Sequence, residues 1–141
     1  MSDFTPDIRA FVCHYTSQQS CAAGAEGMAA EGFPANVRLA RQVCTGKLKV
    51  STLLAAFEDG ADGVYVVGCP ADQCHNAMGS QRAAKRVLAV RKALQELGVE
   101  PERIEMFHLE RGLHPEFIAT ARNMDTRIRA LGVGPFNGET A

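Results

Sequence analysis

Four of the five cysteines in this chain lie where a predicted β-strand ends, or shortly after it. The runs at residues 8–12, 37–43 and 64–68 are followed by Cys13, by Cys44 and by the pair Cys69 and Cys74, respectively. In a parallel α/β sheet the carboxyl ends of the strands share one crevice, so thiols that are distant in sequence can converge there. Four converging thiolates are the ligand set of an iron–sulfur cluster or of tetrahedral zinc.

The loop that holds Cys69 and Cys74 has the spacing of a known cluster motif. Four residues separate these two thiols, as in the plant-type iron–sulfur loop. That gap is a weak signal by itself. It gains weight because Cys13 and Cys44 also end strands, so the sheet itself gives a reason for all four thiols to meet.

Three other interpretations of the cysteines stay open. Structural zinc normally shows paired short spacings such as Cys-x2-Cys, whereas Cys13 and Cys44 stand alone. Cys69 and Cys74 could form a thiol redox pair, and buried cysteines can also fill a core as small apolar residues. A phosphatase-like nucleophile is disfavoured, because it would want an arginine six residues after the cysteine. Those positions hold Gln19, Val50 and His75.

Length and composition predict a single cytoplasmic domain. A chain of 141 residues suits one ordinary domain. Its 15 Lys and Arg nearly balance 16 Asp and Glu, which disfavours nucleic acid or an anionic membrane as a partner. Residues 1–7 lack the features of a signal peptide, and no run approaches the roughly 18 apolar residues of a membrane span. An odd number of cysteines argues against a disulfide framework.

Strand and helix signals alternate along the chain, which is typical of an α/β domain. Residues 64–67 form a β-branched and aromatic run, as expected for a central strand buried on both faces. Apolar residues spaced 4, 3, 4, 3 predict helices over 83–97 and 117–131. Residues 104–109 suggest a fourth strand, and Ser51 is a plausible N-cap for a further helix.

The expected architecture is one iron–sulfur α/β domain over residues 1–141. We expect a mostly parallel sheet of about four strands with flanking helices, flavodoxin-like or thioredoxin-like in layout. The core should cover about residues 8–132, with a weak helix at 20–31 and a flexible tail at 133–141. The strand order cannot be derived from these patterns.

Several short stretches carry a family resemblance when they are taken together. They are FVCHY at 11–15, PANVR at 34–38, VCTGK at 43–47, ADGVYVVGC at 61–69 and DQCH at 72–75. In this combination the chain resembles the delta subunit family of the methyl-viologen-reducing hydrogenase. The resemblance runs from about residue 11 to about residue 131, which is nearly the whole chain.

That resemblance implies a small subunit with one [2Fe-2S] cluster and no substrate chemistry of its own. Such a subunit relays electrons between an electron-donating catalytic module and a flavin-bearing subunit of a heterodisulfide-reductase-like complex. The family's cysteines fall here on Cys13, Cys44, Cys69 and Cys74. The chain itself has neither a Gly-x-Gly-x-x-Gly motif nor a P-loop, so we expect flavin or nicotinamide to bind to a partner.

The first cysteine motif departs from the family pattern. Family members often continue it as Cys-x2-Cys, and the matching position here is Thr16. Cys21 lies five residues further on, inside the predicted weak helix. Either that family cysteine is not an essential ligand, or Cys21 replaces it through a local change in the loop. We expect the first, because Cys21 lies inside the predicted helix and the other four cysteines already complete a set.

Residues next to the cysteines can tune a cluster through hydrogen bonds to its sulfurs and through local charge. The candidates for this role are Thr45, Gly46, Lys47 and His75.

A separate feature is a basic face on the helix predicted over 83–97, and it includes the residue just before that helix. It comprises Arg82, Lys85, Arg86, Arg91 and Lys92. This face is either simply solvated or docks to an acidic partner surface.

Overall fold

A computed structural model of the chain describes residues 4–13, 27, 29–30, 32–42, 48–68, 79–109 and 114–134. Its strands are β1 (Ile8–Cys13), β2 (Val37–Gln42), β3 (Gly63–Gly68) and β4 (Ile104–His108). Its helices are α3 (Val50–Glu58), α4 (Gly79–Glu96), the short 3-10 helix η3 (Pro101–Arg103) and α5 (His114–Leu131). None of the described helices is both long and apolar enough to cross a membrane.

The four strands form one sheet in the order β2-β1-β3-β4, and every neighbouring pair is parallel. The predicted α/β class and four-stranded parallel sheet are therefore confirmed. The order matches the first four strands of a flavodoxin-like sheet. β2, the next strand in the chain, pairs with one edge of β1, and β3 pairs with the other edge. The topological switch point, where such sheets usually bind their ligands, thus lies between β1 and β3.

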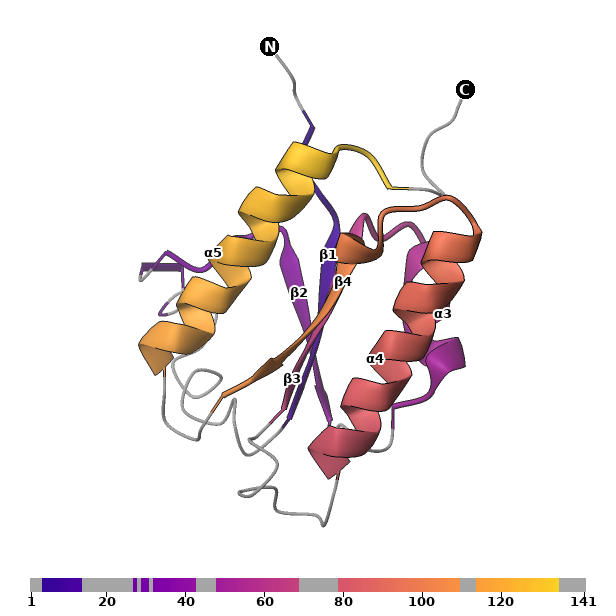
Figure 1. The fold of residues 1–141 in the computed structure, drawn as a ribbon. Coiled ribbons are helices and arrows are strands. Elements are labelled where there is room, and N and C mark those ends of the chain that lie inside the picture. The colour runs from indigo at the N-terminus through magenta and orange to yellow at the C-terminus, as the bar shows by residue number, and fades with distance from the viewer. Residues whose placement is uncertain are drawn as a thin grey trace.

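Helices cover both faces of the sheet. Figure 1 shows α5 on one face and α3 with α4 on the other. The α5 face is filled by Phe117, Ala121, Met124 and Ile128, and the α4 face by Ala83, Val87, Val90 and Leu94. These are the residues of the two predicted apolar stripes, because a 4, 3, 4, 3 spacing places them on one side of a helix. Each large apolar side chain buried in this way contributes about 1.5–3 kcal/mol.

Three local predictions differ from the structure. The N-cap of α3 is Lys49 rather than Ser51, and its side chain makes no capping hydrogen bond. Leu97 is 67% exposed, because α4 ends at Glu96 before the stripe is complete. Leu109 lies just beyond β4 and donates its backbone N–H to the Gly68 carbonyl at 2.8 Å.

The weak helix predicted at 20–31 falls mostly outside the described residues. Gly27, Ala29 and Ala30 are described, and they are helical.

The close approach of α5 to the sheet depends on a glycine. A Cβ atom added at Gly63, the first residue of β3, would lie 2.5 Å from Cγ1 of Ile128 in α5. Real Cβ atoms essentially never approach another atom so closely, so a side chain here would force the Ile128 side chain out of its packed position. Glycine at the start of β3 is therefore a packing requirement.

A buried polar cluster joins the end of α5 to the start of β3. The guanidinium of Arg103, which is 2% exposed, donates to backbone carbonyls of Asp62, Leu131, Gly132 and Val133. The carboxylate of Asp62 accepts the backbone N–H of Gly134 at 2.7 Å. The first two residues of the predicted tail are thereby held against the domain, whereas 135–141 lie outside the described residues.

Candidate metal centre

All four parallel strands end at the carboxyl edge of the sheet, and three adjacent ones lead toward predicted ligands. β1 ends at Cys13, β2 at Gln42 and β3 at Gly68. Cys13 pairs in register with Gln42, and Val12 pairs with Val67 on the other side. Neighbouring strands lie about 4.8 Å apart, so these three ends form one compact edge at the switch point.

Cys13 occupies the last position of β1 and is buried, with 4% of its surface exposed. Side chains alternate between the two faces of a strand. Val12 belongs to the core under α5, and Phe11 packs against the core under α3 and α4. The alternation therefore places Cys13 on the α3 and α4 face. A buried thiol at the switch point suits zinc or the iron of an iron–sulfur cluster, because both bind thiolate sulfur.

The other predicted site residues lie outside the described residues. They are Cys44, Thr45, Gly46, Lys47, Cys69, Cys74 and His75. Cys21, which we expect not to be a ligand, also lies outside the described residues. Within the part of the chain that the structure describes, no group of three or more His, Cys, Asp or Glu could hold a metal ion. The ligand set of Cys13, Cys44, Cys69 and Cys74 accordingly stays a prediction, of which the structure places one member.

Near Cys69 and Cys44 in the sequence, the described residues Gly68 and Leu48 are held in place by hydrogen bonds. Gly68, directly before Cys69, accepts the Leu109 N–H at 2.8 Å. Leu48, four residues after Cys44, is 3% exposed and belongs to the core under α3 and α4. Its carbonyl oxygen accepts a hydrogen bond of 2.6 Å from Nη1 of Arg86.

The contact made by Arg86 was not expected from the sequence, where this residue counted as part of a basic surface. A signal was available, however. Arg86 lies three residues after buried Ala83 and four before buried Val90, so helical spacing places it at the border of the apolar stripe. A long side chain at such a border can reach across to a neighbouring segment.

Three titratable groups away from this edge serve the fold. Both oxygens of the Asp62 carboxylate are engaged, one by the N–H of Asp7 and the other by that of Gly134. Burial raises the pKa of the Tyr65 phenol, and its hydroxyl has no hydrogen-bond partner among the described residues. The hydrogen bond from Arg103 lowers the pKa of Glu100, with a smaller contribution from a backbone N–H. None of these groups lies at the carboxyl edge.

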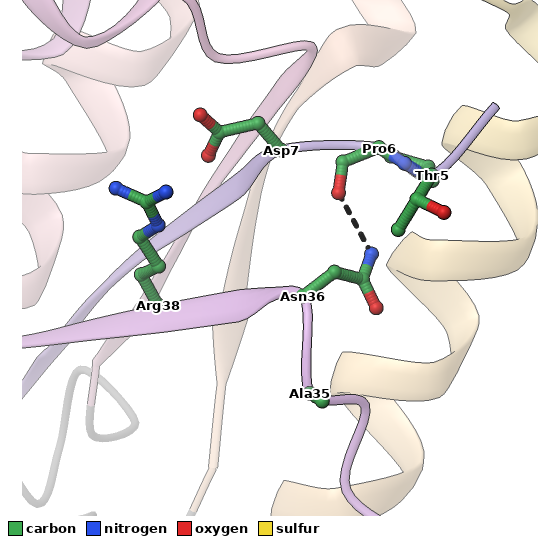
Figure 2. Close-up of a pocket in the computed structure, with 6 residues that line it drawn as sticks. All are labelled: Thr5, Pro6, Asp7, Ala35, Asn36 and Arg38. Atoms are coloured by element: carbon green, nitrogen blue, oxygen red, sulfur yellow. Dashed lines mark hydrogen bonds between the residues drawn. The ribbon is translucent and has the colours of Figure 1, made fainter.

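A pocket of about 250 Å³ lies at the opposite edge, beside the starts of β1 and β2. Figure 2 shows the guanidinium of Arg38 and the carboxylate of Asp7 on the same side of this pocket. The pKa of Asp7 is lowered mainly by its hydrogen bond from Arg9. The Asn36 side chain donates 2.8 Å hydrogen bonds to the Pro6 carbonyl and to Asp125. The Asn36 side chain thus holds the start of β2 next to the start of β1.

Comparison with protein families decides the classification. A model of the family described as methyl-viologen-reducing hydrogenase, delta subunit, matches residues 8–132. The chain belongs to this family. The resemblance drawn from the cysteine motifs is thereby confirmed.

Two relatives align along nearly their full length. The vhu iron-sulfur subunit of an F420-non-reducing hydrogenase from Methanocaldococcus jannaschii is 34% identical over 134 residues, covering 95% of this chain and 98% of the relative. The iron-sulfur subunit of an F420-non-reducing hydrogenase from Archaeoglobus profundus is 32% identical, with 97% of each chain covered.

A third relative has a different organisation. It is a subunit of the ferredoxin/F420H2-dependent CoB-CoM heterodisulfide reductase of Methanosarcina acetivorans, 31% identical over 127 residues. The match covers 90% of this chain but only 16% of that protein. A stretch like this delta subunit chain is therefore one segment of a much longer polypeptide there.

Proposed function

We propose that this chain is an electron-transfer subunit with one [2Fe-2S] cluster at the carboxyl edge of its sheet. The ligands in this proposal are Cys13, Cys44, Cys69 and Cys74. The observation that carries it is that β1, β2 and β3 end side by side, with buried Cys13 at the end of the central one. The names of the aligned relatives, which are iron-sulfur subunits, support it.

Covalent connection favours the convergence of the other ligands. Cys69 is the residue after Gly68, and Cys44 is the second residue after Gln42. Successive Cα atoms are about 3.8 Å apart, so neither thiol can be far from its strand end. Cys74 follows Cys69 by five residues in the sequence. A [2Fe-2S] cluster takes four thiolates, and these four positions would supply them.

The bound cluster would supply the chemistry of accepting and returning one electron. The protein's own part is to hold the thiolates and to set their surroundings. Thr45, Gly46, Lys47 and His75 are the residues that we propose tune the cluster, through hydrogen bonds and charge next to the cysteines. The buried position of Cys13 would keep that side of the cluster away from water.

The proposed partners are a flavin-bearing heterodisulfide-reductase-like subunit and an electron-donating catalytic module. Support comes from the Methanosarcina acetivorans relative, in which a similar stretch is part of a longer heterodisulfide reductase polypeptide. Domains joined in one chain are held at high local concentration, so a separate subunit of the same kind should dock to such a protein.

The test of this role uses the assembled complex. The cluster should be reduced by the donating module and reoxidised by the flavin-bearing subunit, whereas the isolated chain should turn over no substrate. An isolated chain with turnover, or a cluster remote from every other cofactor in the complex, would contradict the relay. A colourless protein with an alkylatable Cys69 and Cys74 pair would favour a thiol redox enzyme. A zinc-bound, redox-inactive protein would favour a structural adaptor.

We further propose that the docking contact uses the exposed face of α4. Arg86 and Arg91 do not belong to this face, since Arg86 bonds to Leu48 and Arg91 pairs with Glu105 at 3.7 Å. The α4 basic surface comprises Arg82, Lys85, Leu88 and Lys92, all exposed, with Leu88 63% exposed. None of its three cations pairs with a described residue. An acidic partner patch with an apolar centre would complement it.

Reversing the charge of Lys85 and Lys92 together should slow association with the flavin-bearing partner. We expect a decrease of about tenfold or more at low ionic strength and a weaker salt dependence, because exposed charges mainly steer encounter. Stopped-flow association kinetics would measure it, with the cluster spectrum unchanged. The control is the same double reversal of Arg122 and Arg129 on α5, in the opposite layer. Equal rates for both variants would contradict docking through α4.

A further inference from the structure

One contact in the structure ties together the two chain segments that lead to and from the predicted ligands. Nη1 of Arg86, in the second turn of α4, donates to the Leu48 carbonyl at 2.6 Å. The hydrogen bond joins residues 38 positions apart and is partly buried. A charged donor in a partly buried place makes a stronger hydrogen bond than a neutral one in water.

The segment 43–47 carries Cys44 and three of the predicted tuning residues. Both residues that flank it are held in place. Gln42 is paired in register with Cys13 at the end of the sheet, and Leu48 is buried and bonded to Arg86. Because only five residues lie between these two held positions, a displacement of Leu48 should be transmitted along the chain to Cys44.

The helix that carries Arg86 also follows the other cysteine loop. α4 begins at Gly79, five residues after Cys74. Arg86 lies seven residues into that helix, about 10 Å along its axis. The Arg86–Leu48 contact therefore couples the chain that leaves the Cys69 and Cys74 loop to the chain that leaves Cys44.

We propose that Arg86 is a positioning residue for the cluster. By holding Leu48 against α4, it sets the distance between the Cys44 segment and the loop of Cys69 and Cys74. This inference rests on the proposed function. Arg86 would thus affect the geometry and retention of the cluster, in addition to any contribution to the stability of α4. Residues that orient metal ligands without touching the metal typically change metal affinity by roughly 10- to 100-fold when removed.

The experiment compares Arg86→Met, Arg86→Lys and Arg91→Met with the wild-type chain. Methionine keeps the apolar stem and removes the donor, while lysine keeps a donor. Arg91→Met is the matched control, since Arg91 is a partly buried arginine of the same helix that pairs with Glu105. The measurements are iron release to a chelator, the electron paramagnetic resonance spectrum of the reduced protein, and the midpoint potential. Thermal unfolding is recorded for every variant.

We expect Arg86→Met to release iron roughly tenfold faster or more, with a changed resonance spectrum. Arg86→Lys should lie nearer to wild type, and Arg91→Met should match it. Hydrogen exchange of the peptide 43–49 in the metal-free protein provides a second readout, and it should rise in Arg86→Met only. If Arg86→Met lowers the melting temperature but leaves iron release, spectrum and exchange equal to those of Arg91→Met, its role is merely structural and the inference is overturned. A wild-type chain without iron would instead overturn the proposed function, and this inference with it.

Discussion

Cys13→Ala is expected to abolish or transform the iron–sulfur cluster while leaving the chain folded. Cys13 is the proposed ligand that the structure places, buried at the end of the central strand β1. Without its thiolate the ligand set has three members, and a cluster that needs four would be lost or rebuilt on another ligand. The loss of one buried sulfur should lower the free energy of unfolding by only about 1 kcal/mol. Iron analysis and visible spectra of the purified variant would measure the effect.

The matched variant for this prediction is Cys21→Ala. It also removes a cysteine from the first third of the chain, but we expect it to keep the wild-type iron content and spectrum. Cys44→Ala, Cys69→Ala and Cys74→Ala should behave like Cys13→Ala. Loss of the cluster in Cys21→Ala together with its retention in Cys13→Ala would reverse the assignment of these two residues.

Replacing Arg103 with alanine is expected to destabilise the domain strongly, at the edge of the sheet opposite to Cys13. Arg103 is 2% exposed, and its side chain donates to four backbone carbonyls at 2.9–3.3 Å and to Glu100 at 2.8 Å. Three of those carbonyls, from Leu131 to Val133, are at the end of α5, where the helix cannot satisfy them itself. Alanine would leave buried acceptors without donors.

The expected decrease in the free energy of unfolding is about 3–5 kcal/mol, a large part of the roughly 5–15 kcal/mol that holds a typical domain together. Urea unfolding of wild type and Arg103→Ala would measure it. Arg103→Lys should recover part of the loss, because a single ammonium group reaches fewer carbonyls than the guanidinium fork. Arg129→Ala is the control, since Arg129 forms a half-exposed ion pair with Asp125 that should contribute no more than about 1 kcal/mol. A decrease in the free energy of unfolding of less than about 1 kcal/mol in Arg103→Ala would contradict this stabilising role of Arg103.

The elements that were predicted well are those with a strong local pattern. The run at 64–67 is β-branched and aromatic, and β3 is buried along its whole length. The 4, 3, 4, 3 spacings placed the buried faces of α4 and α5 correctly, because helical periodicity depends only on neighbouring residues. The expectation that Cys13 ends a strand is likewise confirmed.

What could not be predicted depends on contacts between distant residues. The strand order β2-β1-β3-β4 follows from pairing, which leaves no mark in a single strand. Arg103 bonds to partners 28–41 residues away, and Arg86 to one 38 residues away. Helical spacing places Arg86 at the border of the apolar stripe, but no local pattern names the distant partner of either arginine. The ligand set beyond Cys13 stays a prediction from strand ends and family resemblance.

The most direct test of the proposed function is the metal content of the wild-type chain. The protein would be purified without oxygen and analysed for iron, acid-labile sulfide and zinc, with spectra before and after reduction. We expect a coloured protein with about two iron and two sulfide per chain and a resonance signal that appears on one-electron reduction. A colourless protein without iron or sulfide, whether it holds zinc or no metal at all, would contradict the proposal.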